Sequence, residues 1–441
     1  MISTTPAFNL KVVLKETGLA ADTLRAWERR YGLPVPQRTQ GGHRLYSQRD
    51  IETIKWLMAR QAEGLSISRA VDAWNEQTAS GSDPLAGTIP STIPSLTAKP
   101  AASLPAETAL DTLRSHWVAA CLDFNENLAE QTLNQAFAIF PIEAVCVEVL
   151  QKGMSEIGNR WYANQATVQQ EHFASGLAMR RLNALLLASP ISSQPSTVLI
   201  GCPAEEWHTF TPLLLALFLR RRGVNMIYLG ANVPTQRFAD TIKDVKADLV
   251  VLVAQQLITA ATLQETAQAL SSQKITVAFG GRIFNIHPNL AASIAGHFLG
   301  SELASAVAGI EMLLKNKSKQ IDPAPASPAY VAAHNAYEAK RPEIELTVNQ
   351  WLAPLAIAPD DIKTGIHFLG ENISAALQLG SMSYVSSEVD WLKTLLQAHA
   401  PHPEQLVHFM ELYARAVDKN INGQGKPIFE WFSAEMQKLK S

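Results

Sequence analysis

Apolar residues change their spacing several times along the chain, and these changes divide it into regions. Between residues 193 and 316, short β-branched runs alternate with longer stretches of helical spacing, a pattern typical of βαβ units. The expected strands are residues 198–200, 224–229, 249–254, 275–279 and 297–299. We therefore predict a five-stranded parallel sheet covered by helices, a Rossmann-like α/β domain.

The regions on either side of this α/β domain have helical periodicity. Residues 108–192 place apolar side chains three to four positions apart and predict a four-helix bundle. Residues 344–441 predict an all-α C-terminal domain of four or five helices. The expected C-terminal helices are residues 344–356, 359–379, 384–399, 403–420 and 427–440.

The first 75 residues have a third pattern. Two short helices, residues 9–19 and 23–31, flank a turn that contains Gly18, and a glycine-tipped hairpin at residues 37–46 and a helix at 50–62 follow. This order predicts a winged helix-turn-helix domain. Residues 9–75 carry eleven Lys and Arg against seven acids, whereas the whole chain has a net charge of -3. A local basic cluster in an acidic chain indicates contact with nucleic acid through this domain.

Composition separates these domains and limits the function classes. Residues 76–107 are rich in Pro, Ser and Thr and predict a flexible linker, and residues 317–343 predict a second one. The three cysteines have no metal-ligand or disulfide spacing. We see no export signal and no apolar run of bilayer length, so we expect a cytoplasmic protein without a membrane partner.

The candidate chemistry lies on the loop after the first expected strand. In open parallel sheets, ligands bind at the carboxyl ends of the strands. Glu206-x-His208 places there a histidine that can bind a metal and a carboxylate that can hold its other ring nitrogen. The pair Gly280-Gly281 after the fourth strand allows close approach of backbone to a ligand. No G-x-G-x-x-G sequence follows the first strand, which argues against a nucleotide-binding sheet.

A second group of candidate residues lies in the expected bundle. Trp161 is followed, after nine residues, by Glu171 and His172. A tryptophan can cover the face of a flat apolar ligand, while Glu and His can hydrogen-bond its polar groups. Taken singly, these residue types are also ordinary core or surface residues.

The N-terminal motif resembles a known family. Residues 23–33 and 41–46 are similar to the winged-helix DNA-binding domain of the MerR family. The resemblance implies a second helix in the major groove of double-stranded operator DNA, with base contacts from Arg25 and Arg29. It implies DNA contacts by the following further residues: Tyr31, Arg38, His43, Arg44 and Tyr46.

The bundle and α/β features together resemble the cobalamin-binding module of CarH-type light-sensing repressors. The resemblance implies that His208 is the lower axial ligand of cobalt in adenosylcobalamin, and that Glu206 is its partner. It implies that Trp161, Glu171 and His172 enclose the upper adenosyl group. The remaining cofactor-binding residues that it implies are Gly230, Asn232, Val233, Gly280 and Gly281. The implied function is a light-responsive repressor, not an enzyme, that binds operator DNA in the dark as a cofactor-dependent dimer or tetramer.

Three departures from the CarH-type pattern leave alternatives open. Thr211 replaces a glycine, and Gln255 replaces the serine of a Ser-x-Leu motif. Tyr162 stands where CarH-type proteins carry a histidine that caps cobalt after photolysis. A light-independent cobalamin-sensing regulator is therefore the first alternative, and a corrinoid-dependent enzyme subunit is the second.

The C-terminal domain is absent from the usual CarH-type chain. It distantly resembles helical extensions of some cobalamin photoreceptors, among them the bilin-binding photocobilins. The domain contains no cysteine, which excludes a thioether-linked bilin, but a noncovalent bilin or haem near His367 or His408 stays open. The alternative is an oligomerisation bundle without a ligand, because amphipathic helices mostly bury against each other.

Overall fold

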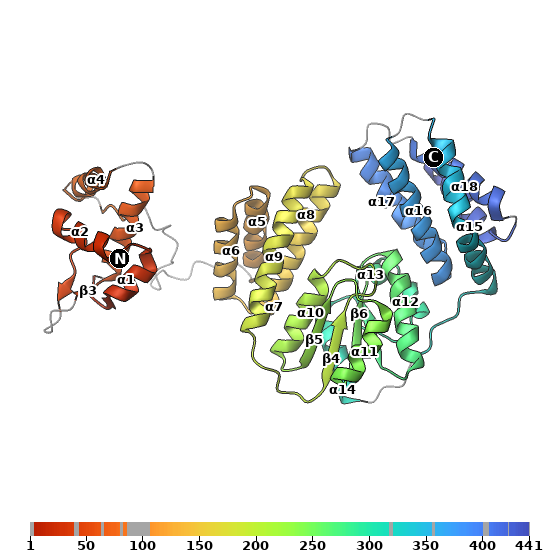
Figure 1. Ribbon diagram of the computed structural model, residues 1–441, viewed down its shortest axis with the longest axis horizontal. Helices are drawn as coiled ribbons and strands as arrows, with labels where there is room; N and C mark the ends of the chain where they lie inside the picture. The colour runs from red at the N-terminus through yellow and green to blue at the C-terminus, as the bar shows by residue number, and fades with distance from the viewer. Residues whose placement is uncertain are drawn as a thin grey trace. The chain divides into compact units, whose positions relative to one another are not determined.

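The computed structural model describes a protein of two compact units, Met1–Ser103 and Leu104–Ser441 (Figure 1). It describes residues 4–38, 44–62, 66–79, 83–85, 106–316, 321–354, 358–399, 405–421 and 423–440. Among the described helices, none is both long and apolar enough to cross a bilayer.

The first unit is a small helical domain with a three-stranded antiparallel sheet. Its helices are α1 (Leu10–Thr17), α2 (Ala21–Tyr31), α3 (Gln48–Ala62) and α4 (Ile67–Ala79). Its strands are β1 (Phe8–Asn9), β2 (Gln37–Arg38) and β3 (Arg44–Tyr46), in the order β1-β3-β2. Gly18 ends α1 in the left-handed conformation, with φ 67°. The predicted winged helix-turn-helix is confirmed; its hairpin tip, residues 39–43, lies outside the described residues.

The first unit extends beyond residue 75, where we expected a linker to begin. Helix α4 continues to Ala79, and Leu85 is buried in the same core as Leu24 and Trp27. Asp83 pairs with Arg49 through two hydrogen bonds of 2.8 Å each. These contacts could not be predicted from composition, because one leucine leaves the composition of the stretch polar. Residues 80–82 and 86–105 of the expected linker lie outside the described residues.

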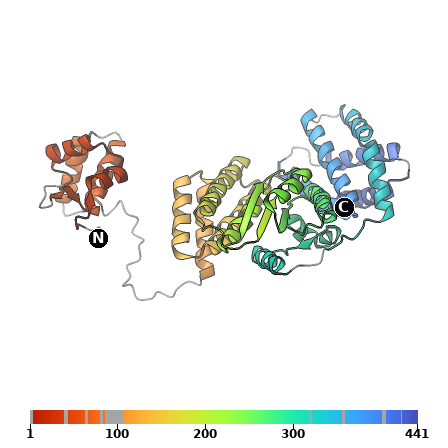
Figure 2. The same cartoon turned by 60° about the horizontal axis from the view of Figure 1, so that its bottom comes forward.

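The second unit begins with the predicted four-helix bundle. Its helices are α5 (Ala106–Leu122), α6 (Glu126–Ile139), a composite third helix, and α9 (Val168–Ala188). The third helix consists of α7 (Ile142–Val145), the π-helical segment η1 (Cys146–Gln151) and α8 (Lys152–Tyr162). Figures 1 and 2 show these helices side by side next to the sheet.

A five-stranded parallel sheet follows, as the sequence predicts. Its strands are β4 (Thr197–Gly201), β5 (Asn225–Gly230), β6 (Leu249–Val253), β7 (Val277–Gly280) and β8 (His297–Phe298), in the order β5-β4-β6-β7-β8. Every residue of β4 and β6 is buried, which explains their continuous apolar runs. The strand order reverses at β4, and ligands bind at such a switch point in open α/β sheets.

Helices cover both faces of the sheet and connect it to its neighbours. They are α10 (Phe210–Arg221), α11 (Thr235–Val245), α12 (Leu257–Ser272), α13 (Arg282–Ile286), the 3-10 helix η2 (Pro288–Ser293) and α14 (Leu303–Lys315). Helix α10 is buried along most of its length, since it shares one apolar core with the bundle and one face of the sheet. The other core joins α12 to the C-terminal helices.

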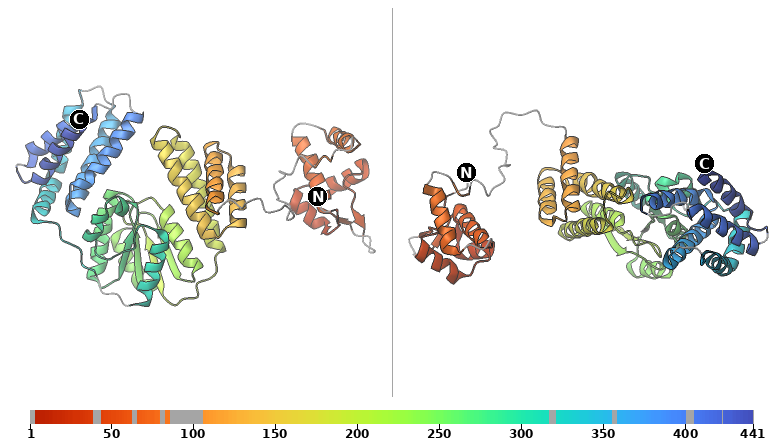
Figure 3. Two further views of the ribbon diagram at one scale, coloured as in Figure 1. Left: turned by 180° about the vertical axis from the view of Figure 1, so that it is seen from behind. Right: turned by 90° about the horizontal axis from the view of Figure 1, so that it is seen from above.

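The C-terminal region is all-α, as predicted. Its helices are α15 (Pro328–Leu352), α16 (Pro359–Leu379), α17 (Ser383–His399), α18 (Gln405–Ile421) and α19 (Lys426–Lys440). Our expected start of the first helix, residue 344, is wrong. Pro328 occupies the first helical turn, where proline is tolerated, and Pro342 lies inside the helix without ending it. Figure 3 shows this domain beside the sheet domain and the bundle.

Candidate functional site

The loop between β4 and α10 carries a tightly held Glu206–His208 pair. Glu206 is fully buried, and its Oε1 accepts hydrogen bonds from the backbone N–H of His208 at 2.8 Å and from Nδ1 of the same residue at 2.7 Å. Its Oε2 accepts from the backbone N–H of Gln255 at 2.7 Å and from the hydroxyl of Thr259 at 2.6 Å. Both carboxylate oxygens are therefore satisfied.

The charges of this pair follow from these contacts. Burial acts to raise the pKa of Glu206, but hydrogen bonds from His208, Thr259 and Gln255 outweigh it and lower the pKa below its usual range. The hydrogen bond to Glu206 raises the pKa of His208, although burial acts against this shift. Because an ionised carboxylate can only accept, Nδ1 carries the proton, and Nε2 is the ring nitrogen left to bind a metal.

A second loop holds the histidine loop in place. Glu205 adopts the left-handed conformation, with φ 67°, and its N–H donates to Oδ1 of Asn232 at 2.9 Å. The N–H of Asn232 in turn donates to the carbonyl of Glu206 at 2.9 Å. Gly230 accepts from Cys202 at 2.9 Å, and Val233 donates to Cys202 at 3.1 Å. The loop 230–233 thus supports the peptide that presents His208.

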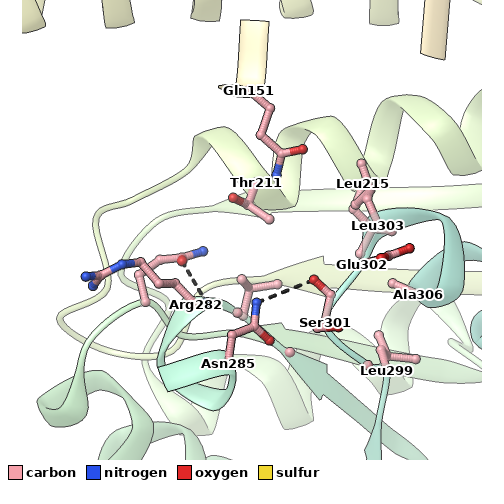
Figure 4. Close-up of a pocket in the computed structure, with 15 residues that line it drawn as sticks. Gln151, Thr211, Leu215, Arg282, Asn285, Leu299, Ser301, Glu302, Leu303 and Ala306 are labelled. Atoms are coloured by element: carbon pink, nitrogen blue, oxygen red, sulfur yellow. Dashed lines mark hydrogen bonds between the residues drawn. The ribbon is translucent and has the colours of Figure 1, made fainter. Parts of the chain in front are cut away.

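A pocket opens beside this pair, at the carboxyl ends of β6, β7 and β8 (Figure 4). Its empty volume, which includes space open to solvent, is about 630 Å³, and its lining includes Thr211, Gln255 and Arg282. Gln151 reaches the same pocket from the bundle, as Figure 4 shows. The pocket therefore lies between the bundle and the sheet. His208 is not part of its lining, but Gln255 belongs both to the lining and to the Glu206 network.

The glycine pair after β7 lines this pocket in two different ways. A Cβ on Gly281, whose φ is 126°, would lie 1.9 Å from the carbonyl oxygen of Ala254. A Cβ on Gly280 would meet no atom within 4 Å. Gly281 is therefore required by the fold, whereas Gly280 keeps space open on the pocket side.

The predicted bundle residues lie at one end of the bundle. Trp161 belongs to the last turn of α8 and is half-buried, while Glu171 and His172 lie in the first turns of α9. The side chains of Glu171 and His172 hydrogen-bond each other at 2.8 Å. Among the causes that act on the pKa of His208, the charge of Glu171 raises it and comes last.

Tyr162 engages the C-terminal domain. Its hydroxyl donates to the carbonyl of Trp391 at 2.9 Å, and its ring stacks on that indole with centroids 6.2 Å apart. In this structure the side chain that replaces the expected histidine is used for a contact between domains.

In the first unit, the predicted DNA-contacting residues separate into three groups. Arg25 and Arg29 are exposed on α2, and Tyr31 is half-buried at its end. Arg38 pairs with Arg44 in the wing ladder, and His43 lies outside the described residues. Arg44 donates from Nε to Glu28 at 2.8 Å but keeps part of its guanidinium exposed.

Our prediction that Tyr46 contacts DNA is wrong. Tyr46 is fully buried, and its hydroxyl donates to Glu28 at 2.6 Å. It is a core residue that ties the wing to α2, and a side chain without exposed surface cannot reach a phosphate.

The histidines considered for a second chromophore lie on the surface of the C-terminal domain. The side chain of His367 is 73% exposed and lies 3.6 Å from Glu371. The side chain of His408 is 51% exposed and lies 3.9 Å from Glu411. Each histidine thus faces solvent beside a carboxylate.

Sequence reasoning missed Thr259 and Arg282. Thr259 lies in the first turn of α12 and donates to Glu206 across a separation of 53 positions, which no local pattern reveals. Arg282 follows Gly281 directly, and its N–H donates to Gln255 Oε1 at 3.0 Å. The departure at Gln255 was the one available signal, since an unusual side chain at a motif position indicates an unusual contact.

Comparison with family models assigns three segments of the chain. Residues 8–76 match the MerR HTH family regulatory protein model. Residues 113–186 and residues 196–304 each match a model described as a B12 binding domain. These matches cover the winged domain, the bundle and the α/β domain described above.

Comparison with known proteins gives transcriptional regulators and a corrinoid protein among the relatives. The chain is 29% identical over 309 residues to the HTH-type transcriptional repressor CarH of Myxococcus xanthus, covering 68% of this chain and 98% of that protein. It is 29% identical over 247 residues to the repressor CarA of the same organism, covering 55% of this chain and 75% of that protein. It is 25% identical over 139 residues to the trimethylamine corrinoid protein of Methanosarcina barkeri, covering 30% of this chain and 63% of that protein. The chain therefore joins a MerR-type helix-turn-helix domain to two B12-binding domains.

Proposed function

We propose that this protein is an adenosylcobalamin-dependent, light-responsive repressor, which binds operator DNA in the dark and releases it after illumination. The observation that supports this most directly is the Glu206–His208 pair beside the pocket, in a chain whose first domain is of the MerR type. The relatives named CarH and CarA, both repressors, support the same function.

The residues present fit a cobalt corrinoid. Within the described ranges, no cluster of three or more His, Cys, Asp or Glu side chains could hold a bare metal ion. A metal at His208 must therefore bring most of its ligands with it, as cobalt does in a corrin ring. The side-chain nitrogen of Gln255 is buried in the pocket lining without a partner among the described residues. A corrinoid carries amide oxygens that can accept from such a donor.

We assign the following roles to the residues of this site. His208 Nε2 would hold cobalt, while Glu206 fixes the ring and keeps Nδ1 protonated. Trp161, Glu171 and His172 would enclose the adenosyl group. The cofactor tail would lie in the pocket that Gly280 and Gly281 line. Gly230, Asn232 and Val233 support the histidine loop from behind.

The proposed control of DNA binding uses linked equilibria. Bound adenosylcobalamin supplies a cobalt–carbon bond that visible light can cleave. The side chains around the upper face, above all Trp161, hold the bundle in one position only while the adenosyl group is present. That position favours a dimer or tetramer. Several linked winged helix-turn-helix domains bind DNA far more tightly than one.

The DNA contacts in this proposal come from the first unit. Arg25 and Arg29 read base edges from α2, with Tyr31 beside them, and Arg38, His43 and Arg44 of the wing contact phosphates. Such a protein works in the cytoplasm, at the nucleoid.

A light-independent cobalamin sensor is the second candidate. The contact of Tyr162 with Trp391 supports it, because this side chain is engaged elsewhere and is not a histidine. A corrinoid-dependent enzyme subunit has the similarity to the trimethylamine corrinoid protein in its favour. The MerR-type domain argues against the enzyme.

A second chromophore in the C-terminal domain, a noncovalent bilin or haem, stays a prediction. His367 and His408 are accessible on its surface, as described above. The absorption spectrum of the purified protein tests this directly, since either chromophore adds bands that a corrinoid lacks.

Size-exclusion chromatography with absorbance detection tests the proposed function. The protein is loaded with adenosylcobalamin and run in darkness and after green light, and operator binding is measured on the same samples. We expect both the spectrum and the oligomer size to change with light. His208→Ala should lose the His-ligated spectrum, while His116→Ala, an exposed histidine on α5, should behave as the parent. Cofactor uptake without any light response favours the light-independent sensor, and no uptake overturns the proposal.

A further inference from the structure

One face of α17 lies against the cofactor-binding domains. Three residues follow Tyr384 by three, four and seven positions, namely Ser387, Glu388 and Trp391. The four residues therefore share one side of the helix. We call these four residues the bridging face.

The first half of the bridging face contacts the sheet domain. The ring of Tyr384 lies 5.0 Å from that of His287, and Ser387 Oγ is hydrogen-bonded to His287 Nε2 at 2.8 Å. His287 follows α13 directly, the helix that begins with the pocket residue Arg282. Burial raises the pKa of Glu388, and the positive charge of Arg282 acts against this shift.

The second half of the bridging face contacts the bundle. Trp391 stacks on Tyr162 with an interplanar angle of 17°, and its carbonyl accepts the hydrogen bond from the hydroxyl of Tyr162. Tyr162 is the last residue of α8 and follows Trp161 directly. This contact therefore lies next to a residue that we assign to the upper face of the cofactor.

Within the C-terminal domain, α19 holds α17 through Ser386. Ser386 donates to Glu435 of α19 at 2.7 Å and accepts from Trp431 Nε1 at 3.0 Å. The domain is itself fixed to the sheet domain, because Gln378 of α16 donates to the Ala261 carbonyl of α12 at 3.1 Å. A movement of the bundle therefore cannot leave α17 unaffected unless the Tyr162–Trp391 contact breaks.

We propose that the C-terminal domain is a clamp on the cofactor site. Its bridging face joins α13 to α8 and so fixes the separation of the two domains that enclose the corrinoid. This inference rests on the proposed function. It assigns Tyr162 and Trp391 as positioning residues, which hold the two walls and touch each other rather than the cofactor.

The test uses the full-length protein and three variants. Trp391→Ala removes the stacked ring, and Tyr162→Phe removes the hydroxyl but keeps the ring. Trp351→Ala is the matched control, because this tryptophan of α15 contacts Arg415 and Lys419 within the C-terminal domain. Hydrogen exchange of α17 and α8 is measured without cofactor, and the release rate of cobalamin is measured on loaded protein.

We expect Trp391→Ala to speed cobalamin release by about tenfold, because it removes the indole that stacks on Tyr162. The backbone carbonyl that accepts from the hydroxyl of Tyr162 is kept in this variant. Tyr162→Phe should have a smaller effect in the same direction, and the control should release cobalamin at the parent's rate. Without cofactor, α17 and the end of α8 should exchange faster in Trp391→Ala than in the control.

Two results separate the failure of the clamp from the failure of the proposed function. If Trp391→Ala exchanges faster at α17 and still releases cobalamin at the parent's rate, the clamp is wrong and the proposed function stands. If the parent takes up no cobalamin, the proposed function fails, and the clamp fails with it.

Discussion

One oxygen of Glu206 accepts hydrogen bonds from both the backbone N–H and the Nδ1 of His208. The imidazole is therefore fixed at two points by a residue of its own loop. That residue is held in turn by Thr259 and Gln255, at the start of α12. The orientation of His208 consequently depends on a helix far from it in sequence.

The first prediction concerns Thr259. Thr259→Val removes the hydroxyl that donates to Oε2 of Glu206. That oxygen then keeps the bond from the backbone N–H of Gln255. In the proposed site Glu206 is the partner of the metal ligand His208, and loss of such a partner lowers metal affinity by about 10- to 100-fold. Thr259 acts on His208 through Glu206. Equilibrium titration with adenosylcobalamin should show a loss near the lower end of this range. The control is Thr241→Val, which removes a hydroxyl that donates to the backbone carbonyl of Arg237 within α11. Equal affinity in both variants contradicts the role given to Thr259.

The two neighbouring glycines should respond differently to alanine. Gly281→Ala places a methyl group against the carbonyl of Ala254 at a positive φ, so we expect the folded state to lose more than about 2 kcal/mol. Gly280→Ala meets open space and should keep the parent's thermal stability. If the cofactor tail occupies this pocket, Gly280→Ala should nevertheless bind cobalamin less tightly. Thermal denaturation of the cofactor-free variants and cobalamin titration separate the two effects.

A third prediction tests the reassignment of Tyr46. Tyr46→Phe removes a buried hydroxyl that donates to Glu28, which should cost about 1–3 kcal/mol of stability in the first unit. The salt dependence of operator binding should stay that of the parent, because no phosphate contact is lost. Arg25→Ala should instead leave stability unchanged and weaken binding. A shallower salt dependence in Tyr46→Phe would restore Tyr46 as a DNA contact.

Acid should weaken one contact between the bundle and the sheet domain. Glu143 of α7 accepts from Arg221 Nε of α10 at 2.8 Å. Burial acts to raise the pKa of Glu143, but the bond from Arg221 contributes to a net lowering. A carboxyl with a lowered pKa stabilises the fold above its unfolded pKa of about 4.3, and this contribution is lost as pH falls through the lower folded value.

The variant Glu143→Gln should therefore be less stable than the parent at pH 6, by under about 1 kcal/mol because solvent screens this half-exposed pair. The difference should disappear toward pH 3. Urea denaturation of both proteins across this range measures it, and a difference that grows in acid would contradict the assignment.

Local patterns allowed much of the fold to be predicted from sequence. The runs that became β4 and β6 are apolar throughout, since strands buried on both faces need no alternation. Glu206 and His208 are two residues apart, so their contact could be inferred from spacing alone. The glycine at position 18 marked the end of α1 because few other residues adopt its conformation.

Contacts between distant segments could not be predicted in this way. The hydroxyl of Tyr46 and the carboxylate of Glu28 belong to a strand and a helix whose separation depends on the whole first unit. Tyr46 followed a motif that suggested a surface position, yet packing buried it. We expected the first C-terminal helix to start at residue 344, but α15 continues through Pro342 and back to Pro328, and its tertiary contacts with α16 and α18 keep the helix intact. In each case the global packing outweighed a local preference.

The contact between Tyr162 and Trp391 joins residues 229 positions apart. Translation adds roughly 5–20 residues per second, so about 10 to 50 s pass between the synthesis of the two. The histidine loop and the pocket residues from Thr211 to Ala306 are synthesised during this interval, before the bridging face exists. The contact that joins the two walls of the site therefore forms only after most of the chain has left the ribosome.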